Sequence, residues 1–210
     1  MIEATVRRTG ELLVVGTVRG LMGEVPPLVQ RLESFQPATV AVGISFDELT
    51  GLADHFLGRP SEPVVPLTSS EAAEAKAITQ FGEVRVPNPS VLAALEWARS
   101  HDVPVEAVDP SDETYATMFT DHITYFELVR RTLRERKLTR APPKATSADE
   151  LAKRWHTRLT PGKGSRAFDS AREAAICETT ERLAERIPRV ALVVDRERFD
   201  PVVARLRRTP

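Results

Sequence analysis

Leu12-Leu13-Val14-Val15-Gly16-Thr17 is a run of four apolar residues that ends in glycine and threonine. A short apolar run bounded by such residues predicts a buried strand. The segments 39–42 (Thr-Val-Ala-Val) and 190–194 (Val-Ala-Leu-Val-Val) have the same character. Strands that are apolar throughout are typical of parallel sheets covered by helices on both faces. We therefore take these runs as the centre of the fold.

Residues with helical spacing lie between the predicted strands. Val25, Leu28, Leu32 and Phe35 share one face of a helix predicted over 24–35. Capping or proline signals predict further helices, which begin near Ser45, Thr68, Asn88, Asp112, Ser147, Ser165 and Pro201. The remaining predicted strands cover 4–7, 82–86 and 103–108. This alternation predicts an α/β fold with a mostly parallel central sheet, helices on both faces and a helical, basic insertion over about 112–166.

Length and composition predict one domain over residues 1–210. The single cysteine, Cys177, excludes a disulfide framework, and its place within a predicted helix indicates a buried, inert thiol. We find no secretory signal pattern and no apolar run near the ~20 residues that cross a bilayer. These features favour a cytoplasmic protein without a membrane partner.

The net charge of −1 conceals a strong asymmetry along the chain. Residues 1–129 have a net charge of −11, whereas residues 130–210 have a net charge of +10. Within 130–166 there are 12 basic and 3 acidic residues. This pattern suits nucleic acid, an acidic partner or self-association. The simpler interpretation, which we favour, is a solvated surface whose charge is balanced by the acidic half of the same fold.

Sites in sheets of this kind form beyond the carboxyl ends of the strands. That rule selects residues 16–24, 43–45, 109 and 195–198, which we expect to converge in space.

Five segments carry a family resemblance through most of the chain. They are 13–20 (Leu-Val-Val-Gly-Thr-Val-Arg-Gly), 36–45 (Gln-Pro-Ala-Thr-Val-Ala-Val-Gly-Ile-Ser), 105–109 (Val-Glu-Ala-Val-Asp), 170–173 (Ser-Ala-Arg-Glu) and 189–199 (Arg-Val-Ala-Leu-Val-Val-Asp-Arg-Glu-Arg-Phe). In order and spacing they resemble TraB/PrgY/GumN-like domains of the erythromycin-esterase/ChaN-like superfamily. The resemblance implies an α/β domain and, in active relatives, a metal-dependent hydrolase site.

The motifs depart from the family at the residues that would serve a metal. Arg19 and Arg198 stand where the family has histidine, and Gly43 stands where it has glutamate. Arginine has no lone pair to offer a cation, and glycine has no side chain. The histidines at 55, 101, 122 and 156 form no paired motif that would replace the lost ligands. We therefore expect no metal site and a degenerate hydrolase motif set.

An anion site is the hypothesis that survives these departures. Gly16 and Thr17, with Arg19, Arg172 and Arg198, are its candidate ligand-binding residues, because guanidinium groups hold carboxylate or phosphate bidentately. The amide groups at the start of the helix over 24–35 would add a positive dipole end. In the alternative interpretation these arginines pair internally with Glu24, Asp109, Glu173 or Asp195.

Three functions follow, in order of preference. The first is a ligand-binding or scaffold protein of the TraB-like type that has lost hydrolase activity and has an anionic ligand at Arg19 and Arg198. The second is a protease-like or esterase-like hydrolase in which Glu24, Asp109 and Glu173 hold Mn or Mg in a rearranged site. The third is association with nucleic acid through 130–166.

A homo-oligomer is also expected. An apolar stripe from Tyr115 to Leu133 along one long helix (112–137) lies between acidic and basic halves, so it could join two copies symmetrically as a homodimer.

Overall fold

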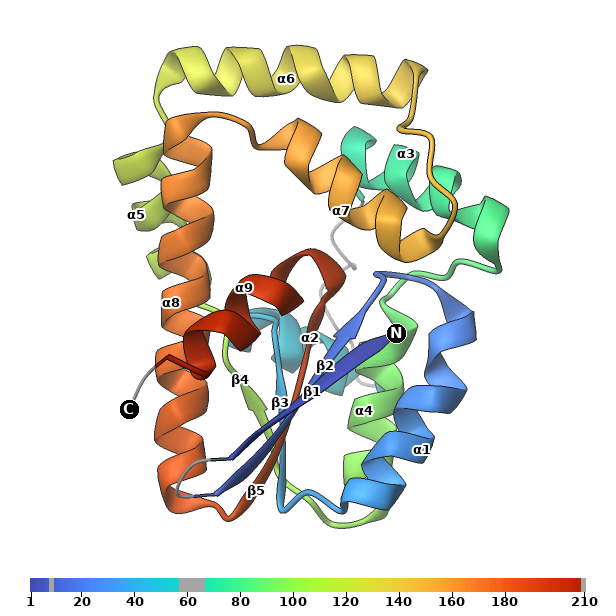
Figure 1. Ribbon diagram of the computed structural model, residues 1–210, viewed down its shortest axis with the longest axis vertical. Helices are drawn as coiled ribbons and strands as arrows, with labels where there is room; N and C mark the ends of the chain where they lie inside the picture. Colours follow the sequence, from blue (N-terminus) through green and yellow to red (C-terminus); the bar gives the residue numbers. More distant parts are fainter. Residues whose placement is uncertain (8–9, 57–66, 209–210) are drawn as a thin grey trace.

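The computed structural model describes residues 1–7, 10–56 and 67–208, and these contain a five-stranded sheet (Figure 1). Its strands are β1 (Ile2–Arg7), β2 (Glu11–Thr17), β3 (Thr39–Val42), β4 (Val105–Ala107) and β5 (Arg189–Asp195). The strand order is β1-β2-β5-β3-β4. Strand β1 is antiparallel to β2, and the other neighbours are parallel. The predicted α/β fold with a mostly parallel sheet is confirmed.

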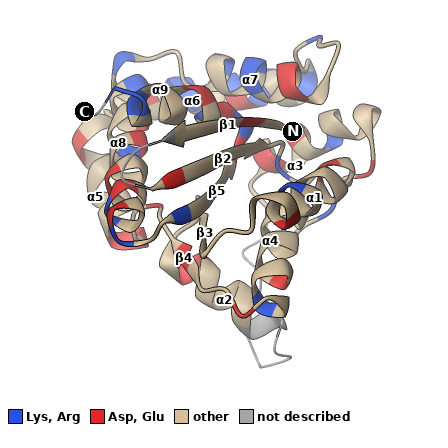
Figure 2. Cartoon of the chain, turned by 60° about the horizontal axis from the view of Figure 1, so that its bottom comes forward, with Lys and Arg blue, Asp and Glu red and all other residues tan. Residues whose placement is uncertain are grey.

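Helices cover both faces of the sheet, as predicted, and each face packs against a pair of them (Figure 2). Leu13 and Val15 face α1 (Val25–Phe35) and α4 (Pro89–Ser100) in one apolar cluster. Leu12 and Val14, which point the other way, belong to a second cluster with α8 (Lys163–Arg186) and α9 (Arg196–Leu206). Because successive residues of a strand alternate between faces, a fully apolar strand serves both clusters.

A further set of helices covers the carboxyl ends of the strands (Figure 1). It consists of α3 (Ser69–Ile78), α5 (Asp112–His122), α6 (Tyr125–Arg140) and α7 (Ala148–Leu159). Val18 and Leu21, which follow β2, pack with Ile78 and Leu151 in a third apolar cluster. The chain also forms α2 (Phe46–Phe56) and the short helices η1 (Met22–Glu24) and η2 (Thr79–Phe81). The predicted strand-end site is thus enclosed by helices.

The prediction of one long helix over 112–137 is wrong, because this segment forms two helices, α5 and α6. Thr124 caps α6 and forms a capping box with Glu127, while Ile123 is extended. The break also divides the predicted apolar stripe. Tyr115 and Phe119 of α5 pack edge-on against Phe168 of α8, whereas the stripe residues of α6 are exposed.

Two further element predictions need correction. The last helix begins at Arg196, directly after β5, so Pro201 lies inside it and not at its start. The predicted strand over 82–86 is reduced to a single bridge between Leu21 and Val84. The capping signals at Ser45, Thr68, Asn88 and Ser147 are confirmed, and Cys177 is buried. Within the described ranges, no helix is long and apolar enough to span a membrane.

Candidate functional site

The carboxyl ends of β2 and β5 bring Arg19 and Asp195 into contact. Asp195 ends β5 and is buried, and its Oδ2 accepts a hydrogen bond of 2.5 Å from Nη2 of Arg19. Nη1 of the same arginine lies 3.2 Å from Oε1 of Glu71, which comes from α3. Arg19 was expected to be available to a ligand. It is instead paired with two carboxylates, as the alternative interpretation held for Asp195.

Arg172 is paired in the same way with Asp109. The arginine extends from α8, and its Nε donates to Oδ1 and Oδ2 of Asp109 at 2.7 and 3.0 Å. Its Nη2 donates to Oδ2 as well. Both side chains are largely buried, since 16% of Arg172 and 3% of Asp109 are exposed. A second arginine of the predicted anion site is therefore neutralised within the fold.

The surrounding guanidinium groups keep Asp195 ionised. Burial would raise the pKa of its carboxyl group, but the nearby charges of Arg19, Arg198 and Arg172 outweigh burial and lower that pKa below its ordinary value. These three arginines thus act on one carboxylate, which places the expected residues of different segments around a common centre.

Helices α2 and α3 bring two more carboxyl groups to this centre. Burial raises the pKa of Glu48, and Asp195 and Asp109 add to that rise. Burial, together with the charge of Glu197, raises the pKa of Glu74 to about 8. Neither residue was predicted from the sequence as a site residue. Glu48 was visible only as part of a helix cap, and nothing in the local pattern singled out Glu74.

Arg198 differs from the other two arginines. It is buried, with 7% of its surface exposed, and its Nη1 atom has no hydrogen-bond partner among the described residues. Two acidic groups of α8 that act on Arg198 have other partners. Asp169 Oδ2 lies 3.1 Å from Nε2 of His156, and Glu173 Oε2 lies 3.8 Å from Nε of Arg205. A buried guanidinium with a free donor is thus left at the start of α9.

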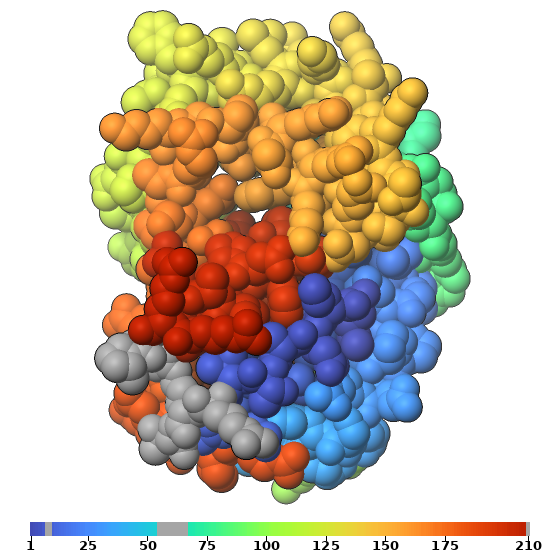
Figure 3. All heavy atoms as spheres, in the orientation of Figure 1, coloured from blue at the N-terminus to red at the C-terminus, as the bar shows by residue number. Residues whose placement is uncertain are grey.

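The helices that carry this group surround a hollow. Figure 3 shows gaps between the orange atoms of α7 and α8 and the red atoms of α9. His156 comes from α7, Asp169 and Glu173 come from α8, and Arg198 comes from α9. Burial raises the pKa of Glu173, although Arg198 opposes that rise.

Gly16, Thr17 and Glu24 have structural roles. A Cβ atom on Gly16 would lie 2.8 Å from Cβ of Phe199, so this glycine lets α9 approach the sheet. Thr17 is buried, with 1% of its surface exposed. Glu24 accepts hydrogen bonds from the Val18 amide at 2.6 Å and from the amino group of residue 1 at 2.5 Å. The predicted ligand-binding glycine and the candidate catalytic glutamate are therefore engaged within the fold.

The start of α1 lacks the amide donors that the anion-site hypothesis assigned to it. Pro26 and Pro27 occupy its first turn, and proline has no N–H group.

The residues present do not fit the metal site that the family resemblance implies. In the described part of the chain, no group of three or more His, Cys, Asp or Glu side chains is placed to hold a metal ion. Glu24, Asp109 and Glu173, proposed as a rearranged set, have separate partners. A Cβ atom at Gly43 would lie 3.0 Å from Cγ1 of Val194, so a family-like glutamate there would require rearrangement.

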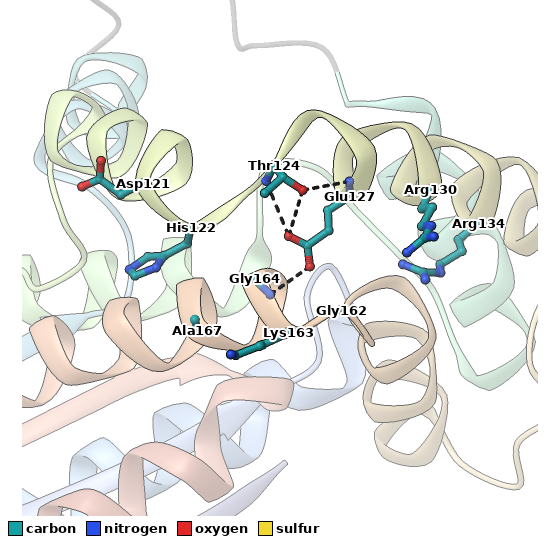
Figure 4. A pocket seen from close by; sticks show the side chains of 10 residues that line it. All are labelled: Asp121, His122, Thr124, Glu127, Arg130, Arg134, Gly162, Lys163, Gly164 and Ala167. Atoms are coloured by element: carbon teal, nitrogen blue, oxygen red, sulfur yellow. Dashed lines mark hydrogen bonds between the residues drawn. The ribbon is translucent and has the colours of Figure 1, made fainter.

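A separate cavity of about 530 Å³ lies where α5, α6 and α8 meet (Figure 4). Oε1 of Glu127 accepts a hydrogen bond of 2.8 Å from the Gly164 amide at the start of α8. Arg130, Arg134 and Lys163 also line the cavity. Helix α8 begins at Lys163, two residues before the predicted start at Ser165. The carboxylate of Glu127 caps this helix and fixes α6 to it.

Neither a protein-family model nor a curated protein matches the chain. The TraB-like resemblance therefore rests on the motifs quoted above. An α/β fold hosts many functions, so the fold class adds nothing specific to that resemblance.

Proposed function

We propose that the chain is a ligand-binding protein of the TraB-like type, that it has no metal-dependent hydrolase activity, and that Arg198 binds an anionic group of its ligand. The observation that carries this proposal is the buried guanidinium whose Nη1 has no hydrogen-bond partner among the residues that the structure describes. Leaving a buried charged donor unsatisfied is costly, so a bound acceptor would stabilise this arrangement.

An anionic acceptor suits Arg198 for two reasons. Guanidinium donors match the geometry of carboxylate and phosphate oxygens, and charge-assisted hydrogen bonds of this kind are stronger than neutral ones. Asp169 and Asp195 already have His156 and Arg19 as partners. An incoming anion would therefore meet a cation that forms no ion pair with any other described residue.

The pairing of the other charges argues against hydrolysis at this site. Hydrolysis in the related proteins would require free carboxylate or imidazole ligands for a divalent cation. Asp109 and Asp195 are held by Arg172 and Arg19 instead. A cation that used these oxygens would have to displace both guanidinium groups.

Calorimetric titration with inorganic phosphate and with acetate tests the binding role. We expect saturable binding of at least one of them to the wild-type protein. Arg198→Gln should weaken it at least tenfold, because one charge-assisted contact to a buried anion is lost. Arg207→Gln, on the exposed end of α9, is the matched control and should bind normally. Arg198→Lys keeps the charge and should retain part of the affinity.

Circular dichroism of each variant would establish that it is folded. Equal affinities of the wild-type and Arg198→Gln proteins, or an absence of binding to both anions, would overturn the anionic-ligand proposal.

A second assay separates this function from the hydrolase alternative. The protein would be incubated with Mn or Mg and with peptide and ester substrates, and no metal-stimulated turnover is expected. Turnover that requires the metal and is lost in Asp109→Ala would contradict the proposed binding role and favour the rearranged carboxylate site.

A further inference from the structure

Helix α6 lies at the edge of the molecule farthest from the sheet and exposes large apolar side chains (Figure 1). The exposed fractions are 74% for Tyr125, 75% for Phe126, 41% for Val129 and 58% for Leu133. We call these four residues the α6 patch. Their spacing places them on one face of the helix. Soluble proteins seldom leave two aromatic rings side by side in water, so the α6 patch indicates an interaction surface.

The α6 patch points away from the rest of the protein. Leu138 is the buried residue of α6, and the helix packs against α3 and α7. At 100° per residue, Leu138 lies on the side of the helix opposite Val129 and Leu133. The inward side of the helix is thus occupied, and nothing in the described ranges of this chain covers the outward side.

Charges flank the α6 patch at both ends. Arg136, Lys137 and Arg140 are exposed on the last turns of α6, and Asp121 is exposed on the last turn of α5, just before the α6 patch. None of these four side chains forms an ion pair with another described residue. Along the chain, an acidic residue is therefore followed by the α6 patch and then by basic residues.

We propose that two copies of this chain associate through α6 in antiparallel orientation, about a twofold axis near Val129. The two α6 patches then cover each other. Asp121 lies on the last turn of α5, just before α6 begins, and Lys137 lies near the end of α6, so the antiparallel arrangement brings the basic end of one copy close to the acidic α5–α6 junction of the other. An isologous interface needs a surface that is complementary to itself. The twofold axis provides this, because it creates the same acidic–basic contact at both ends of the interface.

A second copy fits this surface better than a membrane or a nucleic acid. A helix that lies in a membrane surface needs an apolar face along its length, with basic residues on the other side. Three basic residues of α6, Arg136, Lys137 and Arg140, share the outward face with the α6 patch and follow it, so the apolar face covers only the first part of the helix. A nucleic acid that followed this face would meet the carboxylate of Asp121, which repels phosphate.

Sedimentation velocity of the full chain at 10–100 µM tests the proposal. We expect a dimer for the wild-type protein. Phe126→Glu should raise the dimer dissociation constant at least tenfold, because it places a charge within the apolar contact. The matched control is Phe46→Glu on α2, where the native ring is 67% exposed but lies on a different helix. It should leave the dimer unchanged.

Charge reversal tests the orientation of the pair. Asp121→Lys and Lys137→Asp should each weaken the dimer, whereas the double variant should recover wild-type affinity, because it restores opposite charges across the axis. A wild-type monomer at 100 µM, or a dimer insensitive to Phe126→Glu, would overturn the proposal.

Two further outcomes would reassign the surface. Binding of the monomer to phosphatidylserine vesicles, lost in Phe126→Glu, would assign the α6 patch to a membrane surface and contradict the dimer. Binding to single-stranded RNA with the same dependence would assign it to nucleic acid.

Discussion

Nε of Arg172 donates to both carboxylate oxygens of Asp109, at 2.7 and 3.0 Å, across 63 positions of sequence. The pair joins the segment after β4 to the middle of α8, directly beyond the carboxyl end of the sheet. The buried charge pair therefore links α8 to the strand-end region of the fold.

Removing one partner of this pair should destabilise the fold. Asp109→Ala leaves the Arg172 guanidinium largely buried without its partner, and we expect a loss of about 3 kcal/mol in the free energy of unfolding. Arg172→Met should cost a similar amount. The double variant should lose clearly less than the sum of the two, as measured by urea denaturation. Additive losses would show that the two side chains act independently.

Glu74 should make stability fall as the pH rises. Its pKa of about 8 in the folded protein exceeds the ordinary value of 4.5, so the unfolded chain releases this proton first. Between about pH 4.5 and pH 8 each increase in pH therefore favours unfolding. Glu74→Gln removes this penalty and should unfold at a higher temperature than the wild type at pH 8, by an amount that corresponds to roughly 1–3 kcal/mol.

The same comparison at pH 4 should show no such gain, because Glu74 is then protonated in both states. Glu178→Gln, an exposed change on α8, is the control and should show no pH-dependent difference. A gain for Glu74→Gln that is constant between pH 4 and pH 8 would be inconsistent with the raised pKa.

Glu127 should have the opposite pH dependence. Burial would raise its pKa, but hydrogen bonds from the backbone amides of Gly164, Thr124 and Ser165 together outweigh burial and lower that pKa in the folded protein. A lowered pKa stabilises the fold above the ordinary value of 4.5, and the effect is lost as the pH falls. Glu127→Gln should therefore cost about 1 kcal/mol at pH 7. The cost should shrink below pH 4, and a cost independent of pH would refute this role.

Two glycine substitutions should change the stability of the fold in opposite directions. At Gly164 a Cβ atom would lie 2.1 Å from both Oε2 of Glu127 and the carbonyl oxygen of His122. Gly164→Ala should therefore destabilise the protein, by about 1–3 kcal/mol. Gly51→Ala on α2 meets nothing within 4 Å and should stabilise the protein by up to about 1 kcal/mol, because alanine favours the helix. Thermal unfolding of both variants would check the signs.

The sheet could be predicted from its apolar strands, because a strand buried on both faces has few polar residues to obscure the pattern. The break between α5 and α6 was missed because apolar residues keep helical spacing across it. A signal was nevertheless present, since Thr124 and Glu127 have the spacing of a capping box. This capping-box signal for a helix start should have been given more weight than the helical spacing of the apolar residues.

The location of the site could be predicted from the sequence, but its contacts could not. The strand-end rule selected Arg19, Asp109 and Arg198, and the structure places them around Asp195 or its neighbours. Which carboxylate each arginine contacts depends on how α8 and α9 pack over the sheet, and no local pattern encodes that. Glu74 was missed for the same reason, because only the packing of α3 buries it.

A crystal structure grown with both manganese and phosphate would test the central claim most directly. The account predicts phosphate oxygens within hydrogen-bond distance of Arg198 Nη1, with Asp109 and Asp195 still paired to their arginines. A manganese ion coordinated by the carboxylates of Asp109 and Asp195, with Arg172 and Arg19 displaced, would contradict it.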